Sequence, residues 1–169
     1  MRTVRLFALL SIDGFIVSWD AQQLYDPDFY EYVKYYQEAA IVLTSSEKDY
    51  RYLVQKVGVA KDKIVIADIS SSPGSIYGDT TEKMLKSIHR QKKRKNGYMA
   101  ITENNKKLIT LLLNEGLVDE IILCLLPIIQ GKGKRPFLSI EAPSVWKVRS
   151  RVISDSGITT IHYCWQLIK

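Results

Sequence analysis

The sequence predicts an α/β fold of three layers, in which a mostly parallel central sheet ends in an antiparallel C-terminal hairpin. Over most of the chain, short apolar runs alternate with segments of helical periodicity, which is typical of parallel strands joined by helices. The last segments instead alternate apolar and polar residues on either side of a turn. With 169 residues, 46% of them apolar, the chain has the size and composition of a single domain covering residues 1–169.

The first half of the chain predicts three strands. The expected elements are a strand at 4–11, a helix at 28–39, a strand at 40–43, a helical segment at 47–56 and a strand at 63–69. The first helix begins after Asp26-Pro27, because proline suits a first helical turn. The first strand superficially resembles the apolar core of a signal peptide, but it is short and Asp13 interrupts it, so we interpret it as part of the fold.

The second half predicts two more parallel strands and the hairpin. After a loop at 70–75, the expected elements are a helix at 80–89, a strand at 97–102, a helix at 105–115, a strand at 117–126, and hairpin strands at 146–153 and 158–168. Gly116 is expected in the left-handed conformation that ends many helices. Pro127 has no N–H and ends the next strand. Ser156-Gly157 forms the turn of the hairpin.

The net positive charge suggests nucleic-acid binding, but the position of the basic residues argues against it. The net charge is +6, and clustered Lys and Arg bind phosphates. Most of the excess lies in Arg90-Gln-Lys-Lys-Arg-Lys95, which ends at the turn signal Asn96-Gly97 and has no interleaved aromatic residues for stacking on bases. We interpret this run as a solvated helix end and expect no nucleic-acid partner; a contribution to binding a phosphorylated small molecule is the weaker alternative. No apolar segment is long enough to predict a membrane span.

The cysteines, histidines and aromatic residues suggest little chemistry by themselves. Cys124 and Cys164 show neither metal-ligand spacing nor a CxxC pair, which favours a reducing, cytoplasmic location. His89 and His162 lack metal-like partners at short spacing, so we expect no metal site. One aromatic series is interpreted as a buried helix face or a dimer contact, and it consists of Tyr25, Phe29, Tyr30, Tyr32, Tyr35 and Tyr36. Trp19 and Asp20 are weaker candidates for the wall of a substrate pocket.

Four motifs occur in the order found in a known family. Ser11-Ile-Asp-Gly-Phe-Ile16 is similar to a first-strand motif Ser-Leu-Asp-Gly-x-Ile, and Met99-Ala-Ile-Thr-Glu-Asn-Asn105 stands where the family has a strand ending in Glu-Gly-Gly. The run from Gly116 through Gly133 to Phe137 resembles its most specific signature, and the hairpin around Ser156-Gly157 resembles its closing element. The chain thus resembles the reductase domain of riboflavin biosynthesis, the RibD C-terminal type, within the dihydrofolate-reductase-like proteins.

The resemblance implies a reductase that transfers hydride from NADPH to a small pteridine- or pyrimidine-like substrate. Ligands of open α/β sheets bind at the carboxyl ends of strands, where Ser11, Asp13 and Gly14 follow the first strand. Ser11 and Asp13 are then the candidate catalytic residues, placed near the site of hydride transfer. Gly14 lets the backbone pass close to a nicotinamide ring. The alternative is that Asp13-Gly14 is an ordinary turn pair without a ligand.

The chain departs from the family at the loop after the fourth strand. Glu103 is expected to orient groups near the cofactor, but Asn104-Asn105 replace two glycines that open a helix facing the cofactor phosphates. Asparagine tolerates left-handed geometry, so the turn can survive. Its side chain takes space that a pyrophosphate needs, unless its amide donates to that phosphate. Alternatively, one of the two asparagines only caps the helix that follows.

A second departure follows the second strand. The family has a glycine-containing segment there that touches the adenosine phosphates, whereas this chain has Thr44-Ser-Ser-Glu-Lys48. Thr44, Ser45 and Ser46 either donate hydrogen bonds to a phosphate or cap the next helix, and Glu47 opposes an anion. Later in the chain, Gly131 and Gly133 bracket Lys132, which either approaches the cofactor or only shapes a sharp turn.

Two hypotheses of different classes follow. The leading one is a cytoplasmic, homodimeric, NADPH-dependent reductase. Its expected cofactor-binding residues are Gly14, Thr44, Ser45, Glu103, Asn104, Asn105, Gly131, Lys132 and Gly133. Because two phosphate loops are altered in one chain, the alternative is a non-catalytic relative that binds another nucleotide-like ligand or acts as an assembly partner.

Overall fold

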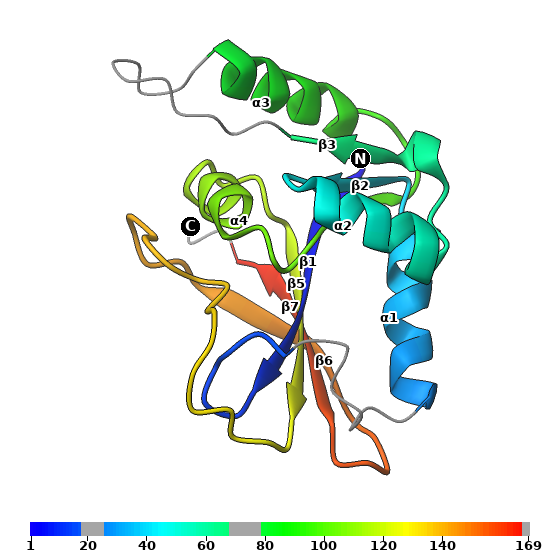
Figure 1. Cartoon of the computed structure of the whole chain (residues 1–169). Coiled ribbons are helices and arrows are strands. Elements are labelled where there is room, and N and C mark those ends of the chain that lie inside the picture. The colour runs from blue at the N-terminus through cyan, green and yellow to red at the C-terminus, as the bar shows by residue number, and fades with distance from the viewer. Residues whose placement is uncertain (18–25, 68–78, 167–169) are drawn as a thin grey trace.

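The computed structural model describes residues 1–17, 26–67 and 79–166. Over these residues the chain forms a seven-stranded sheet in the order β3-β2-β4-β1-β5-β7-β6 (Figure 1). The strands are β1 (Thr3–Ser11), β2 (Ile41–Thr44), β3 (Ile64–Ile66), β4 (Tyr98–Ile101), β5 (Glu120–Leu126), β6 (Trp146–Ile153) and β7 (Thr159–Trp165). Strands β1 to β5 pair in parallel, whereas β7 runs antiparallel to both β5 and β6. The predicted parallel sheet with an antiparallel C-terminal hairpin is confirmed.

Helices cover the two faces of this sheet and make the three predicted layers (Figure 1). The helical elements are α1 (Asp26–Glu38), α2 (Glu47–Tyr52), a π-helical turn (Leu53–Val57), a 3-10 turn (Lys61–Lys63), α3 (Asp79–Lys92) and α4 (Lys106–Asn114). One apolar cluster packs α1 and the π-helical turn onto one sheet face, and a second packs α3 and α4 onto the other. In β4, Ala100 joins the first cluster while Met99 and Ile101 join the second, as the alternation of a strand requires.

The tyrosines of α1 form the helix face that packs on the sheet. Tyr32, Tyr35 and Tyr36 are at most 6% exposed, and their rings meet one another and Phe7 at centroid distances of 4.8–5.6 Å. Burial raises the pKa of Tyr35 and Tyr36 well above the ordinary value. These three residues therefore belong to the core rather than to a dimer contact, whereas Tyr30 is 63% exposed. Tyr25 and the side chain of Phe29 lie outside the described residues.

Several element boundaries differ from those predicted. The third strand was expected at 63–69, but β3 covers only Ile64–Ile66. The strand expected from Leu117 begins at Glu120, because buried Leu117 and Val118 belong to the connection that follows α4. Gly116 has a φ of +62°, so the predicted left-handed helix end is confirmed. The loop predicted at 70–75 lies outside the described residues.

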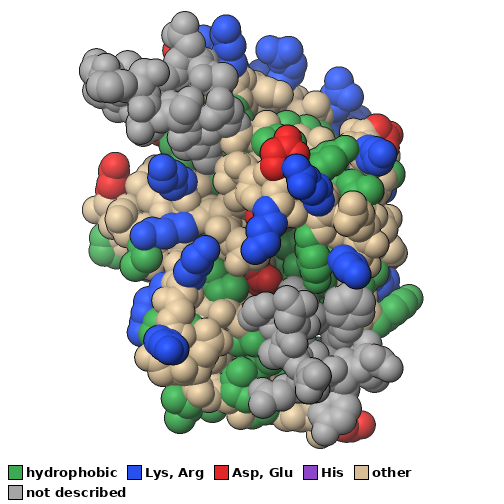
Figure 2. Space-filling view, in the orientation of Figure 1, with side chains coloured by type: hydrophobic (Ala, Val, Ile, Leu, Met, Phe, Trp, Pro, Cys, Tyr) green, Lys and Arg blue, Asp and Glu red, His purple; other side chains and the backbone are tan. Residues whose placement is uncertain are grey.

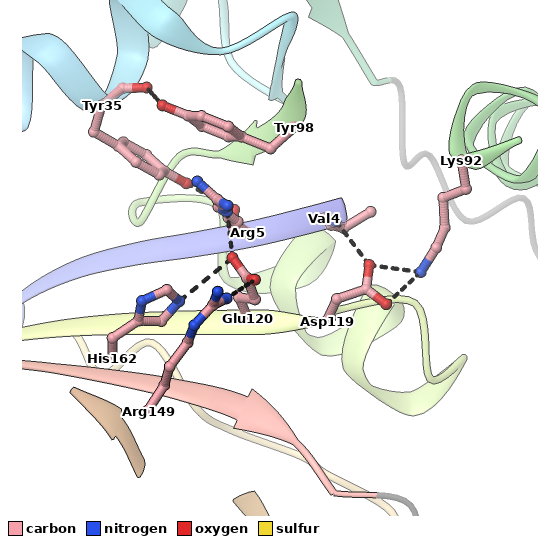
Figure 3. A network of polar contacts seen from close by, with 9 residues as sticks. All are labelled: Val4, Arg5, Tyr35, Lys92, Tyr98, Asp119, Glu120, Arg149 and His162. Carbon is pink, nitrogen blue, oxygen red and sulfur yellow. Dashed lines mark hydrogen bonds and ion pairs between the residues drawn. The ribbon is translucent and has the colours of Figure 1, made fainter. Parts of the chain in front are cut away.

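A network of charged side chains crosses the sheet near the amino end of β5 (Figure 3). Glu120 is 6% exposed and forms ion pairs with Arg5 of β1 and with Arg149 of β6 at 3.1 Å, and its carboxylate lies 3.3 Å from Nε2 of His162 of β7. Its carboxylate therefore connects β5 to strands on both sides, and the hairpin is tied to the parallel sheet by charge as well as by backbone pairing. No local sequence pattern predicts this network, because its members are far apart along the chain.

The neighbouring residue Asp119 anchors the end of α3. Its carboxylate accepts hydrogen bonds from the Lys92 ammonium at 2.7 and 2.8 Å and from the backbone N–H of Val4 at 2.8 Å (Figure 3). Lys92 belongs to the basic run Arg90–Lys95, so part of that run serves the fold. Among the described residues, no helix is both long and apolar enough to cross a membrane.

Replacing Glu120 with alanine is expected to destabilise the protein strongly. The substitution leaves Arg5 and His162 without their carboxylate in a mostly buried setting, and removing one partner of a buried ion pair typically costs about 3 kcal/mol or more. Urea unfolding measures the difference. The matched control is Glu82→Ala, which breaks an exposed pair with Lys86 on α3 and is expected to change the unfolding midpoint little. Equal effects of the two substitutions on the unfolding midpoint would contradict a stabilising role of the buried Glu120 network.

Candidate functional site

A cleft of about 560 Å³ opens at the carboxyl edge of β1, β2 and β4. It is lined by Ile16, Val17, Tyr32, Ser45, Ser46, Lys48, Asp49, Tyr52, Glu103, Asn104, Asn105 and Lys134. A smaller hollow of about 290 Å³ shares Ile16, Asn104 and Lys134 with it and extends toward Lys106 and Arg135. Four of the predicted cofactor residues, Ser45, Glu103, Asn104 and Asn105, therefore come together in one cleft from two loops of the chain.

The cleft exists because β1 and β4 separate. Their pairing ends at Leu6 and Ile101, although β1 continues to Ser11. Beyond that point the carboxylate of Glu103 accepts a hydrogen bond of 2.7 Å from the backbone N–H of Leu9, and the carbonyl of Leu9 accepts one of 3.0 Å from Val17. Glu103 is only 1% exposed. Its carboxylate takes the place of a strand partner and satisfies the edge of β1 where the two strands part.

Asn105 connects the two loops on which the sequence departs from the family. Its side chain is buried at 4% exposure, and its Oδ1 accepts hydrogen bonds from the backbone N–H of Ser45, at 3.1 Å, and from the Ser45 hydroxyl. Its Nδ2 donates to Oγ1 of Thr44 and to Oδ2 of Asp49, both at 3.2 Å, and to Oγ1 of Thr102. We name this set, Thr44, Ser45, Asp49, Thr102 and Asn105, the loop bridge.

The loop bridge resolves the alternatives left open for these residues. Asn105 occupies the N-cap position of α4, but its side chain makes no capping hydrogen bond. The prediction that an asparagine side chain caps this helix is therefore wrong for Asn105. Neither Asn104 nor Asn105 has a positive φ, so the turn does not use the left-handed conformation for which glycine would be needed. Asn104 is exposed and lines both hollows, so it is the asparagine whose side chain occupies space open to a ligand.

The hydroxyl groups after β2 are used in two ways. Ser46 is the N-cap of α2, and its Oγ accepts hydrogen bonds from the N–H groups of Lys48, at 3.1 Å, and Asp49, at 3.3 Å. The capping alternative is thus correct for this loop, with Ser46 as the cap. The Thr44 side chain is fully buried and makes contact with Asp49, the N–H of Ser46 and Asn105. Both Thr44 and Ser45 are thus engaged within the protein.

The N-terminus of α4 is the part of the cleft best suited to an anion. The first N–H groups of a helix have no partner within it, and here no side chain among the described residues caps them. Three lysines, Lys48, Lys106 and Lys134, line the cleft and the adjoining hollow. Figure 2 shows Lys and Arg side chains gathered over the middle of this face of the molecule. The arrangement can hold a phosphate group by backbone donors and by charge together.

Hydrogen bonds of Ser11 and Asp13 connect the end of β1 to the backbone of Gln130 and Gly131, and we call this pair of residues the latch. The Ser11 hydroxyl is buried and donates a hydrogen bond of 2.6 Å to Asp13, and it accepts one of 3.1 Å from the N–H of Phe15. The Asp13 carboxylate also accepts hydrogen bonds from the N–H groups of Gln130, at 3.1 Å, and Gly131, at 2.7 Å. The Ser11 hydroxyl, followed by these two amides, lowers the pKa of Asp13 from 3.8 to about 2. Neither residue lines the two hollows described above.

Three glycines in this region have a positive φ, which favours glycine over other residues. Gly14 has a φ of +81°, and its N–H donates to the carbonyl of Ser11 at 2.9 Å, so the Asp-Gly turn considered from the sequence is present. Gly133 has a φ of +146°, and a Cβ there would lie 2.6 Å from the Gln130 side chain. It lines the smaller hollow. Gly131 also has a positive φ, of +76°. The expectation of a sharp turn at this loop is confirmed.

Lys132 lies at the exposed tip of this loop and does not line either hollow. The basic side chain that reaches the site from the same segment is Lys134, which the sequence analysis did not select. Its neighbour Arg135 stacks over the ring of Phe15 at 4.4 Å. A sequence signal did exist, since the run Lys132-Gly-Lys-Arg135 is basic throughout, but only the tertiary structure distinguishes the lysine that faces the cleft.

The walls of the cleft and the remaining candidate residues complete the description of the site. The apolar and aromatic walls of the cleft come from Ile16, Val17, Tyr32 and Tyr52, which the sequence analysis did not assign to a site. Trp19 and Asp20 lie outside the described residues. Within the described ranges, no group of three or more His, Cys, Asp or Glu side chains is placed to hold a metal ion.

The fold and the position of the cleft can be compared with known proteins. No protein-family model matches the chain, and no curated protein is significantly similar in sequence. Solved structures do match. A protein of Shewanella sp. PV-4 assigned to riboflavin biosynthesis matches with a TM-score of 0.70 at 15% identity, over 98% of this chain and 99% of its own. A pyrimidine reductase-like protein of Corynebacterium diphtheriae matches with a TM-score of 0.67 at 12% identity, over 99% and 93% of the two chains.

A longer protein contains the same fold as one part. RibD of Acinetobacter baumannii matches with a TM-score of 0.60 at 14% identity, over 98% of this chain but only 58% of its own length. The predicted resemblance is therefore confirmed at the level of the fold, which is that of the reductase-like proteins of riboflavin biosynthesis.

The latch predicts a specific change in the titration of Asp13. Replacing Ser11 with alanine removes the largest cause of the lowered pKa, so the pKa of Asp13 is expected to rise from about 2 toward 3.8. Carboxyl-carbon NMR during an acid titration measures it. Because the pKa of Asp13 is lower in the folded state, its hydrogen bonds contribute fully to the stability of the folded protein above the ordinary pKa of 3.8. This contribution to stability is lost as the pH falls through about 2. Ser150→Ala on exposed β6 is the control, and an unchanged Asp13 pKa in Ser11→Ala would refute the latch.

Proposed function

We propose that this protein is an NADPH-dependent reductase of the riboflavin-biosynthesis type, which transfers a hydride to a small pteridine- or pyrimidine-like substrate. The observation that carries the proposal is the uncapped N-terminus of α4, which meets the cleft at the carboxyl edge of the sheet beside Lys106 and Lys134. Open α/β sheets bind their ligands at this edge. The Acinetobacter baumannii RibD structure and the pyrimidine reductase-like structure share the fold, which supports the proposal.

The residues of the cleft divide between two tasks in this proposal. The first N–H groups of α4 and the lysines Lys48, Lys106 and Lys134 bind the cofactor phosphates. Ile16, Val17 and the two tyrosines of the wall form an apolar surface on which a nicotinamide and a flat substrate ring can pack. Glu103 keeps this space open by satisfying Leu9. When bound, NADPH supplies the hydride.

The candidate catalytic residues take a positioning role. Ser11 and Asp13 hold the Gln130–Gly131 backbone against the end of β1, and Lys134 lies three residues beyond Gly131 in the same segment. We therefore assign to Ser11, Asp13 and Gly14 the task of fixing the loop that carries Lys134, rather than direct contact with the transferred hydride.

The expected cellular location, the oligomeric state and the lack of a nucleic-acid partner belong to the same proposal. Neither Cys124 nor Cys164 forms a disulfide bond in the part of the chain that the structure describes, which fits a reducing, cytoplasmic location. We propose a homodimer and no nucleic-acid partner. In support of the latter, Lys92 of the basic run is engaged with Asp119 and with the carbonyl of Leu117 at 3.0 Å, so it is not available to a phosphate backbone.

A second candidate function follows from the loop bridge. Thr44, Ser45 and Asn105 would be natural donors to a phosphate, yet they bind one another. A non-catalytic relative that binds a different nucleotide-like ligand, or that serves only in assembly, is the alternative that this observation favours. The two functions differ in whether purified protein binds and oxidises NADPH.

Titration with NADPH, followed by cofactor fluorescence, tests the reductase proposal. Binding is expected, and replacing Lys134 with glutamine should weaken it about tenfold, since a charge-assisted hydrogen bond to phosphate is worth about 1.5 kcal/mol. Lys147→Gln on β6, away from the cleft, is the matched control and should bind normally. Oxidation of bound NADPH is then measured with a phosphoribosylaminouracil substrate. No binding at millimolar cofactor would reject the proposal and favour the second candidate.

The two asparagines are expected to respond in opposite directions. Asn104→Gly removes an exposed side chain from the cleft, so NADPH should bind more tightly. Asn105→Gly removes the centre of the loop bridge and leaves buried groups of Thr44 and Thr102 without that partner, so it should both weaken NADPH binding and lower stability by about 1–3 kcal/mol. Cofactor fluorescence and urea unfolding measure the two effects. Tighter binding by Asn105→Gly would show that its side chain is an obstruction instead.

A further inference from the structure

Another hollow, of about 490 Å³, lies between α4 and the C-terminal hairpin. Directly paired residues of neighbouring strands point to the same side of a sheet, so the pairs Ile121–Tyr163 and Trp146–Trp165 place these four side chains on one face. They line the hollow together with the end of α4 and the loop before β6. Among the described residues, none lines both this hollow and the two hollows of the candidate site. We call it the apolar hollow.

Aromatic side chains form the walls of the apolar hollow. Four half-buried rings come from three parts of the chain and belong to Phe137, Trp146, Tyr163 and Trp165. The rings of Trp146 and Trp165 have a centroid distance of 5.7 Å, and Nε1 of Trp146 donates a hydrogen bond of 2.8 Å to Oγ of Ser144. Trp165 fits against the end of α4 because Gly116 has no side chain, and a Cβ there would lie 3.0 Å from the Trp165 ring. Such aromatic faces pack on planar rings and attract cations.

The loop that borders the apolar hollow is held to α4 by side chains (Figure 1). Oγ1 of Thr110 donates a hydrogen bond of 2.8 Å to the carbonyl of Leu138. The side-chain amide of Asn114 donates to the carbonyl of Ser139 at 3.4 Å and accepts from the N–H of Glu141 at 3.1 Å. The backbone of this loop therefore has fixed partners, and the hollow exists before a ligand enters it. A preformed site lowers the entropy cost of binding.

The charge of the apolar hollow is opposite to that of the whole chain. The net charge of the chain is +6, yet Glu141 is the one charged side chain among the described residues that line the hollow. Arg151 points to the same side of the sheet, but it lies farther along β6 and does not line the hollow. A cation packed on the aromatic rings can pair with the Glu141 carboxylate, whereas an anion meets that carboxylate without a lining base. The hollow is thus complementary to a ring that carries positive charge.

We propose that the apolar hollow binds a small planar aromatic cation, in which the ring carries a protonated amine or a quaternary nitrogen. The ring packs on the side chains of Trp146, Tyr163 and Trp165, and the positive charge lies toward Glu141. The volume of the hollow falls within the range of about 300–1,000 Å³ that is usual for pockets that bind small molecules. This site is separate from the cleft proposed for NADPH, and the inference does not depend on the reductase activity.

Isothermal titration calorimetry with N-methylquinolinium tests the proposal, because this ion is a planar cation without other polar groups. Binding at one site per chain is expected. Quinoline has nearly the same shape but is neutral at neutral pH, so it should bind about fivefold more weakly or worse. The indole N–H signals of Trp146 and Trp165 in a proton–nitrogen NMR spectrum should shift on binding, which distinguishes the apolar hollow from the cleft.

Two variants separate the contributions of charge and of the aromatic wall. Glu141→Gln keeps the shape of the side chain and removes its charge, so it should weaken N-methylquinolinium binding about fivefold and leave quinoline binding unchanged. Trp146→Leu keeps an apolar wall without an aromatic face, so it should weaken the binding of both compounds. The matched control for net charge is Asp155→Asn, because Asp155 is exposed in the turn of the hairpin and does not line the hollow. Urea unfolding verifies that the variants are folded.

Three results would overturn the proposal. The first is no binding at millimolar N-methylquinolinium, which is also the outcome if a second copy of the chain covers the hollow. The second is equal affinity for N-methylquinolinium and quinoline, which would mean that the hollow selects apolar surface alone. The third is equal weakening by Glu141→Gln and Asp155→Asn. NADPH titration of the same protein tests the proposed function separately: a chain that binds N-methylquinolinium as expected but no NADPH rejects the reductase and leaves the apolar hollow established as a binding site.

Discussion

The hydrogen bond from the Leu9 backbone to the buried carboxylate of Glu103 is the interaction on which the site depends. Beyond Leu6 and Ile101, β1 and β4 no longer pair, and a strand edge left without partners inside a protein would be costly. Glu103 and Val17 supply those partners to Leu9, at 2.7 and 3.0 Å. The space between the separated strands can then be a cleft instead of a gap in the core. Glu103, which was expected to orient groups near the cofactor, thus also has a structural role in satisfying β1.

The loop bridge changes how the two departures from the family are understood. Considered along the sequence, Asn104-Asn105 and Thr44-Ser45 are two independent losses of glycine, each of which weakens the argument for a phosphate site. In three dimensions Asn105 binds Thr44 and Ser45, so the two changes compensate each other. The polar groups that could oppose or bind a phosphate are largely satisfied internally. The backbone of α4 and the lysines around the cleft remain as the anion-binding elements.

The Glu120 network and the apolar hollow beside α4 lie on opposite sides of the C-terminal hairpin. On one side, His162 and Arg149 hold the hairpin to β5 through Glu120 (Figure 3). On the other side, Trp146, Trp165 and Tyr163 are only half-buried around a hollow. The charged side therefore ties the hairpin to the parallel sheet.

The sequence by itself determined the order and type of the elements, the helix end at Gly116, the sharp turn at Gly131–Gly133 and the resemblance of the fold. Periodicity and glycine positions are local properties of the chain, so they can be interpreted without knowing which segments meet. The tertiary structure decided which predicted polar residues are open to a ligand. Asn105 and Thr44 are 61 residues apart, and Ser11 is close to the Gly131 loop only because β1 and β5 are neighbours. Whether a donor is satisfied by the protein or available to a ligand depends on such long-range contacts, and local sequence does not encode them.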